Sequence, residues 1–304
     1  MNPRPDPDTL DGGPAGASEL ATAIVTASYA PDFDRCRLLC ETVDRHVTGH
    51  AEHLILVEAG DMPVFRPLQS LRRRIIDERE LLPSWLRSFR DPFSLFRRRV
   101  WLAPGLPPLR GWHVQQLRRI AVAAAVDAEI LAFCDSDVVF VRPFDCRAFV
   151  SEGGVALFRR DGALAGRRDT EHAIWSANAG HSLGISEPLV SPHDYIATLI
   201  AWRRSAVLAM CARMEAVHGV HWTRAVAARR RFSECMLYGR FVDELMDGEG
   251  HVHSDRELCR VHWTGEALDD RGFAAFLDAL EPHQVAIGMQ SFIGTDIGRI
   301  RRLV

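Results

Sequence analysis

The sequence predicts an α/β fold in which helices flank a mixed, mainly parallel sheet. Two apolar stretches, ATAIVTAS (21–28) and HLILVEA (53–59), have the length and β-branched content of buried strands. A helical pattern over about 32–46 separates them, and a second over 111–128 leads into a third apolar run, EILAF. Continuous apolar strands alternating with helices are typical of a parallel sheet covered on both faces. The 304 residues suit one large domain, which we expect at 19–304.

The amino-acid composition excludes several classes of protein. Apolar residues make up 47% of the chain and charged residues 25%, as in ordinary globular proteins. The formal net charge of −3 gives no general reason to expect a nucleic acid as partner. The chain contains no lysine, so all 37 basic side chains counted as Lys or Arg are arginine. Schiff-base catalysis and a Walker-type phosphate loop both need the lysine amine and are therefore excluded.

The cysteines and the N-terminal residues indicate where the protein works. The seven cysteines form no CxxC pair, which favours reduced thiols in a cytoplasmic protein over a disulfide framework. Residues 1–18 are rich in Pro, Gly and Asp and lack the apolar stretch of a signal peptide, so we expect a disordered tail. No run of 18 apolar residues occurs, and we expect no transmembrane segment.

Residues 62–110 interrupt the alternation of strands and helices. Ten arginines stand against four acidic residues between Arg66 and Arg99, interleaved with Leu, Ile, Phe and Trp. The pattern predicts a basic helical insertion with short amphipathic helices at about 69–80 and 93–99. Such an insertion can be a solvated flap, a surface for a phosphate-bearing or lipid-linked acceptor, a peripheral membrane contact or a protein interface.

Further elements are expected downstream of the third strand. GVALFRR (154–160) has the pattern of a strand, and helices are expected at roughly 193–217, 232–246 and 270–280. The glycine-rich segment ANAGHSLGIS (177–186) is expected to be half strand and half loop.

Two carboxylates, Asp135 and Asp137, follow the third apolar run with only Ser136 between them. Ligands of parallel α/β sheets bind outside the carboxyl ends of the strands. Residues i and i+2 of an extended chain project to the same side, so both carboxylates can face one ion. Mg²⁺ and Mn²⁺ prefer such oxygen ligands and often keep substrate phosphates as further ligands. A strand-end cap or a solvated turn is the alternative.

The sequence resembles the nucleotide-sugar-dependent glycosyltransferases of the GT-A fold, especially an uncharacterised bacterial glycosyltransferase-like family. Three stretches carry the resemblance, which extends more loosely over about 21–265: ATAIVTASYAPDF, GWHVQQLRRIA and ILAFCDSDVVFVRPFD. It implies a GT-A-like fold with a DxD motif, in which a divalent ion, Mn²⁺ or Mg²⁺, bridges the protein and the diphosphate of the sugar donor. A UDP-sugar is the first expectation for the donor, and a glycan, a lipid-linked molecule or a small molecule for the acceptor.

The resemblance also implies roles for individual residues. Asp137 would be the direct metal ligand, and Asp135 would lie towards the ribose and the metal. A lysine often stands at the position of Arg119 in related sequences, and the arginine keeps the charge but changes its geometry. The Asn178 amide would grip a sugar hydroxyl in a glycine-containing loop. The residues expected to contact the donor are Thr26, Ser28, Tyr29, Glu58, Gln115, Gln116, Arg119, Asp135, Ser136, Asn178, Ala179 and Gly180.

Three later residues complete the expected site. Many inverting GT-A enzymes place a general base at the start of a helix after the glycine loop, which implies Glu234, with Asp194 as the second candidate. A carboxylate in a first helical turn is also favoured by the helix dipole without any catalytic duty. Several metal-dependent families supply a late histidine as a metal ligand, which implies His262, although a packed or surface histidine is an equal alternative.

Two other functions remain open. A non-catalytic nucleotide- or glycan-binding protein would keep the nucleotide pocket but would tolerate loss of Glu234. A phosphatase with Asp135 as nucleophile would need its motif near the N-terminus and, usually, a lysine beside the phosphate. Here two strands and a long insertion precede the motif, and lysine is absent.

Overall fold

A computed structural model describes residues 20–303 of the chain, so the tail expected at 1–18 lies outside the described residues. The main sheet has five strands in the order β12-β7-β1-β3-β4. Strands β7, β1, β3 and β4 are parallel, and β12 joins β7 antiparallel. The predicted mixed, mainly parallel α/β fold is therefore confirmed. Its strands are β1 (Thr22–Ala27), β3 (Glu52–Val57), β4 (Arg73–Asp77), β7 (Ile130–Phe133) and β12 (Ile200–Arg203).

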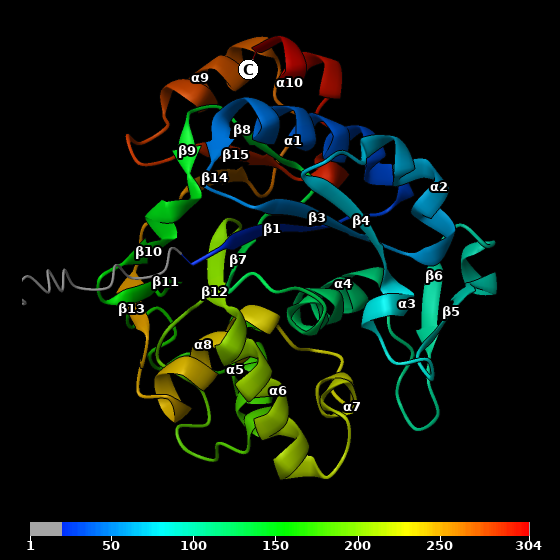
Figure 1. The fold of residues 1–304 in the computed structure, drawn as a ribbon, viewed down its shortest axis with the longest axis vertical. Helices are drawn as coiled ribbons and strands as arrows, with labels where there is room; N and C mark the ends of the chain where they lie inside the picture. Colours follow the sequence, from blue (N-terminus) through cyan, green and yellow to red (C-terminus); the bar gives the residue numbers. More distant parts are fainter. Residues whose placement is uncertain (1–19, 304) are drawn as a thin grey trace, which may run out of the picture.

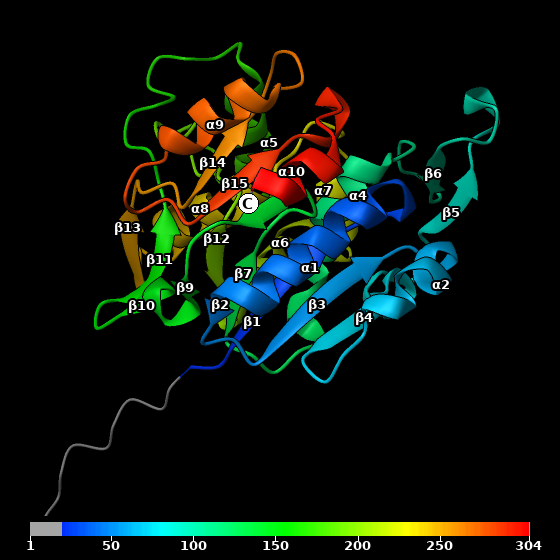
Figure 2. The same ribbon diagram turned by 90° about the horizontal axis from the view of Figure 1, so that it is seen from above.

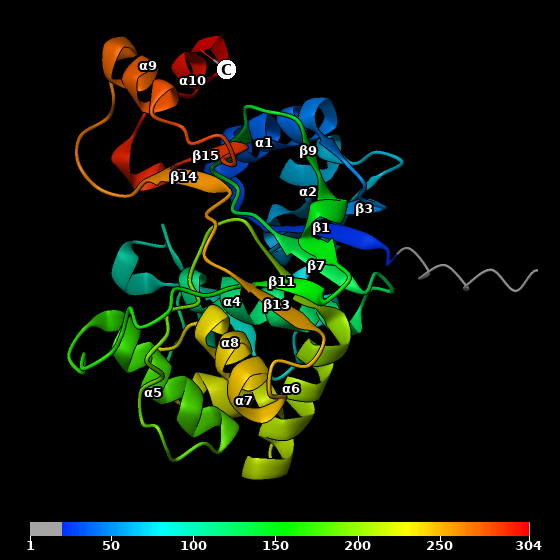
Figure 3. The ribbon, with the colours of Figure 1, turned by 90° about the vertical axis from the view of Figure 1, so that its left-hand side faces the viewer.

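Helices cover both faces of this sheet (Figure 1). On one face lie α1 (Phe33–His46), α2 (Met62–Phe65), α9 (Asp270–Asp278) and α10 (Ile297–Leu303). On the other face lie α3 (Glu78–Leu81), α4 (Gly111–Ala121), α5 (Glu171–Leu183), α6 (Arg204–His218), α7 (Trp222–Ala227) and α8 (Glu234–Leu245), which Figure 3 shows from the side.

The alternation of side chains along the strands explains the two layers. In β1, Val25 joins the core shared with α4 to α8, whereas Ile24 joins the core on the α1 side. In β7, Leu131 and Phe133 face the first core and Ala132 faces the second. Successive residues of a strand point to opposite faces, so an unbroken apolar run fills both cores.

Smaller sheets flank the main one. Strand β8 (Val138–Phe140) begins directly after Asp137 and lies in the order β14-β15-β8 with β14 (Cys259–His262) and β15 (Ala286–Met289). Another three-stranded sheet contains β10 (Val150–Ser151), β11 (Gly154–Phe158) and β13 (His251–Ser254). Two two-stranded sheets pair β2 (Val47–Thr48) with β9 (Phe144–Asp145) and β5 (Arg87–Arg90) with β6 (Arg99–Leu102).

The prediction of a helical insertion at 62–110 is wrong in its main part. Residues 73–77 form β4, the edge strand of the main sheet, and residues 87–90 and 99–102 form the antiparallel hairpin β5–β6, which projects from the body of the molecule in Figure 2. The arginines that suggested amphipathic helices lie on an edge strand, where a polar side chain can find partners. Arg73 is buried against Asp44 at 2.7 Å, and Arg74 pairs with Glu52 on the neighbouring strand.

Two further predictions of secondary structure are corrected. The expected helix at 193–217 begins only at Arg204, because residues 200–203 form β12. Trp202 of that strand packs between Phe133 and Tyr238, with ring centroids 4.5 and 4.7 Å away, and this tertiary packing outweighs the local helical pattern. Residues 177–183 belong to helix α5 and not to a strand or loop. The helices expected at 32–46, 232–246 and 270–280 are confirmed by α1, α8 and α9.

All seven cysteines are free thiols, as the spacing predicts. Within residues 20–303, no helix combines the length and the apolar character needed to cross a membrane.

Candidate functional site at the carboxyl end of the sheet

Arg119 joins two of the predicted site residues. Its Nη1 donates to Asp135 Oδ1 at 3.4 Å and lies 3.0 Å from Glu234 Oε1. The three residues come from the last turns of α4, the end of β7 and the first residue of α8. The side chains of Arg119 and Glu234 are less than a tenth exposed, whereas that of Asp135 is 28% exposed. Asp135 is therefore the member of this group that faces solvent.

The Arg119 guanidinium has unused hydrogen-bonding capacity. Its Nε and Nη2 are buried and have no hydrogen-bond partner in the part of the chain that the structure describes. Its Cζ lies 4.9 Å from the centre of the Phe133 ring, and this cation–π contact stabilises the guanidinium. Buried donors are nearly always satisfied in folded proteins, so these two donors are available to an acceptor from outside the protein.

Glu234 begins helix α8, as the sequence predicts, with Ser233 as the N-cap. The Ser233 hydroxyl accepts from the Met236 amide, and the Glu234 amide donates to Gln116 Oε1 at 3.0 Å. Burial raises the pKa of the Glu234 carboxyl, and the Arg119 guanidinium acts against that rise. The carboxylate is thus held between a helix start and a buried cation.

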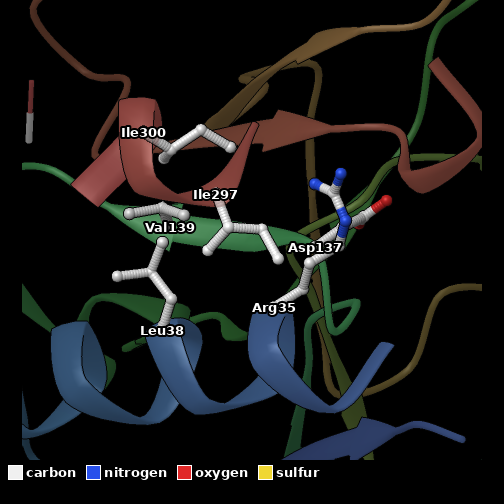
Figure 4. A pocket seen from close by; sticks show the side chains of 6 residues that line it. All are labelled: Arg35, Leu38, Asp137, Val139, Ile297 and Ile300. Carbon is white, nitrogen blue, oxygen red and sulfur yellow. The ribbon is translucent and has the colours of Figure 1, made fainter. Parts of the chain in front are cut away.

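Asp137 is partly buried and has two other carboxylates near it. Its pKa is raised to about 7 by burial and, to a smaller extent, by the negative charges of Asp135 and Asp32, while Arg35 lowers it. Its Oδ1 is buried and finds no hydrogen-bond donor among residues 20–303. Figure 4 shows Asp137 beside Arg35 at the edge of a cavity of about 10 Å³, which is otherwise lined by apolar side chains: Leu38, Val139, Ile297 and Ile300.

Residues at the end of β1 extend this acidic environment. Asp32 is the last residue before α1, and burial raises its pKa, with Arg35 acting in the opposite direction. Burial and then Asp32 raise the pKa of Tyr29, whose side chain is 48% exposed. Ser136 is buried between the two motif carboxylates. Tyr29, Asp32, Asp135 and Asp137 therefore lie together at the carboxyl ends of β1 and β7.

The other residues predicted on the first two strands have internal partners. Thr26 is fully buried, and its hydroxyl lies 3.1 Å from His53 Nε2 and 3.3 Å from Cys134 Sγ. The Glu58 carboxylate accepts from the Gly60 amide and from Ser88 and pairs with Arg99 at 2.9 Å. Ser28 is buried at the end of β1. The side chains of Thr26 and Glu58 thus connect elements of the fold to one another.

Helix α4 presents several predicted residues. Gln116 lies between the Trp112 carbonyl and the Glu234 amide and so connects α4 to α8. Gln115 is half-buried on the same helix. Trp112, Gln116 and Arg119 share one helical face, because residues three or four apart are neighbours on a helix. This face runs from the exposed Trp112 to the buried Arg119.

The prediction of a glycine-containing loop at Asn178, Ala179 and Gly180 is wrong. These residues lie within α5, which begins after the N-cap Thr170 and ends at Gly184 in the left-handed conformation. A Cβ atom at Gly180 would lie 2.3 Å from Arg240 Nη1, so a side chain here would displace the buried Arg240 guanidinium from its place against α5. The Asn178 amide donates to the Arg231 carbonyl at 2.6 Å and holds the segment that leads into Glu234.

Asp194 is paired with His172, and among the described residues it has no hydrogen bond or ion pair with Arg119, Asp135 or Glu234. Its Oδ2 lies 2.7 Å from His172 Nδ1, and its Oδ1 accepts from the Ile196 amide. The His172 ring stacks on Trp175, with centroids 5.1 Å apart, and Trp175 in turn lies 5.4 Å from Trp112. A carboxylate that orients an imidazole is a common arrangement for a general base.

His262 lies on β14, two strands away from β8, and its Nε2 is 3.0 Å from the Glu266 carbonyl. With Trp263 and others it lines a separate open hollow of about 570 Å³. Residues 20–303 contain no group of three His, Cys, Asp or Glu side chains placed to hold a metal ion. His262 therefore does not complete a three-residue ligand set with Asp135 and Asp137 here.

Residues 17–281 match the model of one protein family, which is described as a family of unknown function, DUF6492. The chain belongs to this family. The matched range includes the main sheet, the DxD segment and Glu234, and it ends after α9. No curated protein matches the chain. The family description names no activity, so the resemblance to glycosyltransferases stays a prediction.

In this member of DUF6492, the carboxylates of Asp135 and Asp137 provide part of a binding site for a hard divalent cation. Asp137 has an unsatisfied carboxylate oxygen, and Asp135 is partly open to solvent, although Arg119 donates to its Oδ1. Mg²⁺ is typically bound by one or two carboxylates together with substrate phosphates and water. The described residues offer no third protein ligand, so a cation at this site would take further oxygen ligands from substrate phosphates and water.

Sequence reasoning missed two residues that the fold brings to this region. Asp32 was treated only as the start of a helix, although it follows β1 at the edge of the sheet where ligands bind. His172 had no signal of its own, because its partner Asp194 is 22 positions away and the contact depends on the packing of α5. The position of Asp32 after a buried strand was the one usable sign.

Proposed function

We propose that this protein transfers a sugar from a nucleotide-diphosphate donor to an acceptor and depends on a divalent cation for it. The main support is the arrangement of Arg119, Asp135, Asp137 and Glu234 at the carboxyl edge of β7. Asp137, which has an unsatisfied oxygen, and Asp135, which is partly exposed, suit a cation, and a buried arginine with two unsatisfied donors suits an anionic ligand. A diphosphate together with Mg²⁺ or Mn²⁺ satisfies both requirements at once.

Each residue has a role in this proposal. Asp135 and Asp137 would hold the cation, and Arg119 would donate to the phosphate oxygens or the sugar. When bound, Mg²⁺ or Mn²⁺ would stabilise the negative charge that develops on the diphosphate. The acceptor oxygen forms a bond to the anomeric carbon while the bond from that carbon to the diphosphate oxygen breaks, and the diphosphate leaves with the electron pair. A side chain of the protein accepts the proton of the acceptor hydroxyl.

Two side chains are candidates for that proton acceptor. Glu234 lies at the start of α8, where burial raises the pKa of its carboxyl, but it is paired with Arg119. His172 is partly exposed and oriented by Asp194. A base contributes about 10²- to 10⁴-fold to the rate. The substitutions Glu234→Gln and His172→Gln separate them, because only loss of the true base lowers kcat strongly while donor binding remains.

The first test is a thermal-shift screen of UDP, GDP and their sugars with and without Mn²⁺. We expect stabilisation only when nucleotide and Mn²⁺ are both present, because a ligand that binds the native state raises its stability. Asp137→Ala should abolish this effect. Asp127→Asn is the matched control, since Asp127 is an exposed carboxylate near the opposite end of β7. Stabilisation that is independent of Mn²⁺, or that survives in Asp137→Ala, would contradict the proposal.

A non-catalytic nucleotide- or glycan-binding protein is the second candidate. The observation in its favour is that Glu234 is tied to Arg119 and so is not free to accept a proton. In that case Mn²⁺-dependent binding would persist, but no sugar would leave the donor with any acceptor, and Glu234→Gln and His172→Gln would bind as the wild type does.

A further inference from the structure

The turn between β5 and β6 (residues 91–98, called the hairpin turn below) exposes large apolar side chains. Phe93 is 98% exposed, Leu95 76% and Phe96 57%. Figures 1 and 2 show this turn at the periphery of the molecule, away from the main sheet. Neighbouring apolar side chains exposed together on a monomer usually mark an interaction site.

The hairpin turn has a defined conformation. The Asp91 carboxylate accepts from the Phe93 amide and pairs with Arg110, which anchors the base of the turn to the segment before α4. The Leu95 amide donates to Pro92 and the Phe96 amide to Asp91. Leu95 and Phe96 both have positive φ values, 51° and 61°, which bulky residues rarely adopt. The backbone is thus hydrogen-bonded into an unusual turn while its apolar side chains remain outside.

Positive charge surrounds the apolar side chains. Arg87, Arg90, Arg97 and Arg98 are exposed, and none forms an ion pair within residues 20–303. The one carboxylate of the turn, Asp91, is already engaged by Arg110. The region is therefore locally cationic in a chain whose formal net charge is −3. Arg90 donates to the Phe96 carbonyl and Arg87 to the Ser84 carbonyl, but none of the four guanidinium groups has a carboxylate partner among the described residues.

We propose that the hairpin turn docks on the surface of an anionic lipid bilayer. Phe93, Leu95 and Phe96 enter the boundary between headgroups and acyl chains, and the four arginines contact lipid phosphates. Apolar side chains beside clustered basic residues are the combination that binds bilayer interfaces, and guanidinium groups match phosphate oxygens in pairs. The complementary charge favours this partner over an uncharged apolar protein surface. The inference does not depend on the proposed sugar transfer.

The experiment is flotation of the full chain with vesicles of phosphatidylcholine alone and with about 30% phosphatidylglycerol. We expect binding only to the anionic vesicles, with a loss of affinity when salt is raised. The triple variant Phe93→Ser, Leu95→Ser and Phe96→Ser should bind more than about a hundredfold more weakly. Replacing Arg97 and Arg98 by Gln should weaken binding roughly fivefold for each residue.

Leu71→Ser is the matched control, because Leu71 is fully exposed beside the exposed Arg72 in the loop before β4. It should float as the wild type does, and circular dichroism should show every variant folded. The proposal would be overturned if the wild-type protein bound neither kind of vesicle. It would also be overturned if the triple variant floated with the anionic vesicles as the wild type does. A concentration-dependent dimer in sedimentation velocity that the triple variant loses would also overturn it, because a second copy would then cover the turn.

Discussion

Arg118 and Arg119 are neighbours on α4 and equally buried, but their surroundings differ. Arg118 contacts Glu78 through Nε and Nη2, and Trp101 Nε1 donates to the same carboxylate at 3.0 Å. Arg119 shares a single nitrogen between Asp135 and Glu234, and its other two nitrogens have no partner among the residues described. Consecutive helical residues point about 100° apart. The two guanidinium groups therefore serve two different regions.

The difference separates a structural ion pair from a candidate binding site. The pair of Arg118 and Glu78 joins α4 to α3 and has most of its hydrogen bonds made, so a ligand has nothing to add. The Arg119 group keeps unmade hydrogen bonds, and Asp137 nearby has an unsatisfied oxygen and a raised pKa. Unsatisfied buried groups cost stability in the free protein and become favourable only when a ligand pairs with them.

The largest expected effect on stability is that of Arg118→Met. Removing one partner of a buried pair leaves the other charge uncompensated, which typically costs about 3 to 5 kcal/mol. Urea denaturation should show this loss in the free energy of unfolding, while the folded fraction should still bind UDP and Mn²⁺. An unfolding free energy within about 1 kcal/mol of the wild type would show that Glu78 and Trp101 do not need the cation.

Arg119→Met should affect binding more than stability. The substitution removes two donors that already lack partners, whereas Arg118→Met removes donors that the Glu78 carboxylate accepts. We expect the affinity for UDP with Mn²⁺ to fall about a hundredfold, which corresponds to about 2.7 kcal/mol. Calorimetry measures the affinity, and Arg119→Lys is the charge-conserving control. Should Arg119→Met destabilise the protein as much as Arg118→Met, the contrast between the two arginines would disappear.

The sequence was sufficient for the parts of the fold that have local signals. The strands at 21–28, 53–59 and 129–133 are continuous apolar runs, and the helices α1, α8 and α9 have clear periodicity, so composition and spacing predict them. Strand β4 was missed because its arginines find partners across the edge of the sheet, at Glu52 and Asp44. Strand β12 was missed because Phe133 and Tyr238, both distant in sequence, fix Trp202.

The candidate site was predictable to a similar extent. The sequence predicts Asp135 and Asp137 from their position after a strand, and the resemblance implies Glu234 at the start of a helix, where the structure places it. The link from Arg119 to Asp135 and Glu234 joins three elements, so only the fold brings the three together. The helical packing of Gly180 against Arg240 could not be inferred either, because a glycine in a sequence suggests a turn before it suggests a close contact.

Asp137→Asn should stabilise the protein in a pH-dependent manner. The folded protein holds the Asp137 pKa at about 7, above the ordinary value of 3.8. A carboxyl group whose pKa is raised by folding destabilises the folded state increasingly as the pH rises from about 4 to 7. The advantage of Asp137→Asn over the wild type should therefore grow by on the order of 2 kcal/mol between pH 5 and pH 8.

Thermal or urea unfolding at several pH values, without metal, measures this advantage. Asp127→Asn provides the control, since it makes the same change at an exposed carboxylate near the other end of β7. Addition of Mn²⁺ with UDP at pH 8 should reverse the order, because only the wild type gains from binding. A pH-independent difference between Asp137→Asn and the wild type would show that burial does not raise the Asp137 pKa.

The smallest expected effect is that of replacing Glu78 and Arg118 together by Leu and Met. Apolar side chains of similar size often replace a buried ion pair at little cost, because the desolvation of both charges is avoided. We expect the double variant to lie within about 1 to 2 kcal/mol of the wild type, because the Trp101 indole N–H loses its acceptor and is left buried. A double-mutant cycle in urea gives the coupling energy between the two residues.

The same double replacement at Arg119 and Glu234 tests whether this second pair serves a ligand while the first serves the fold. If Arg119 and Glu234 serve a ligand, replacing both should change the free energy of unfolding no more than the double variant at Glu78 and Arg118 does. It should, however, abolish Mn²⁺-dependent UDP binding. The variant at Glu78 and Arg118 should still bind UDP. Equal loss of binding in both double variants would mean that α4 acts as one unit, and that the unsatisfied nitrogens of Arg119 do not by themselves mark the site.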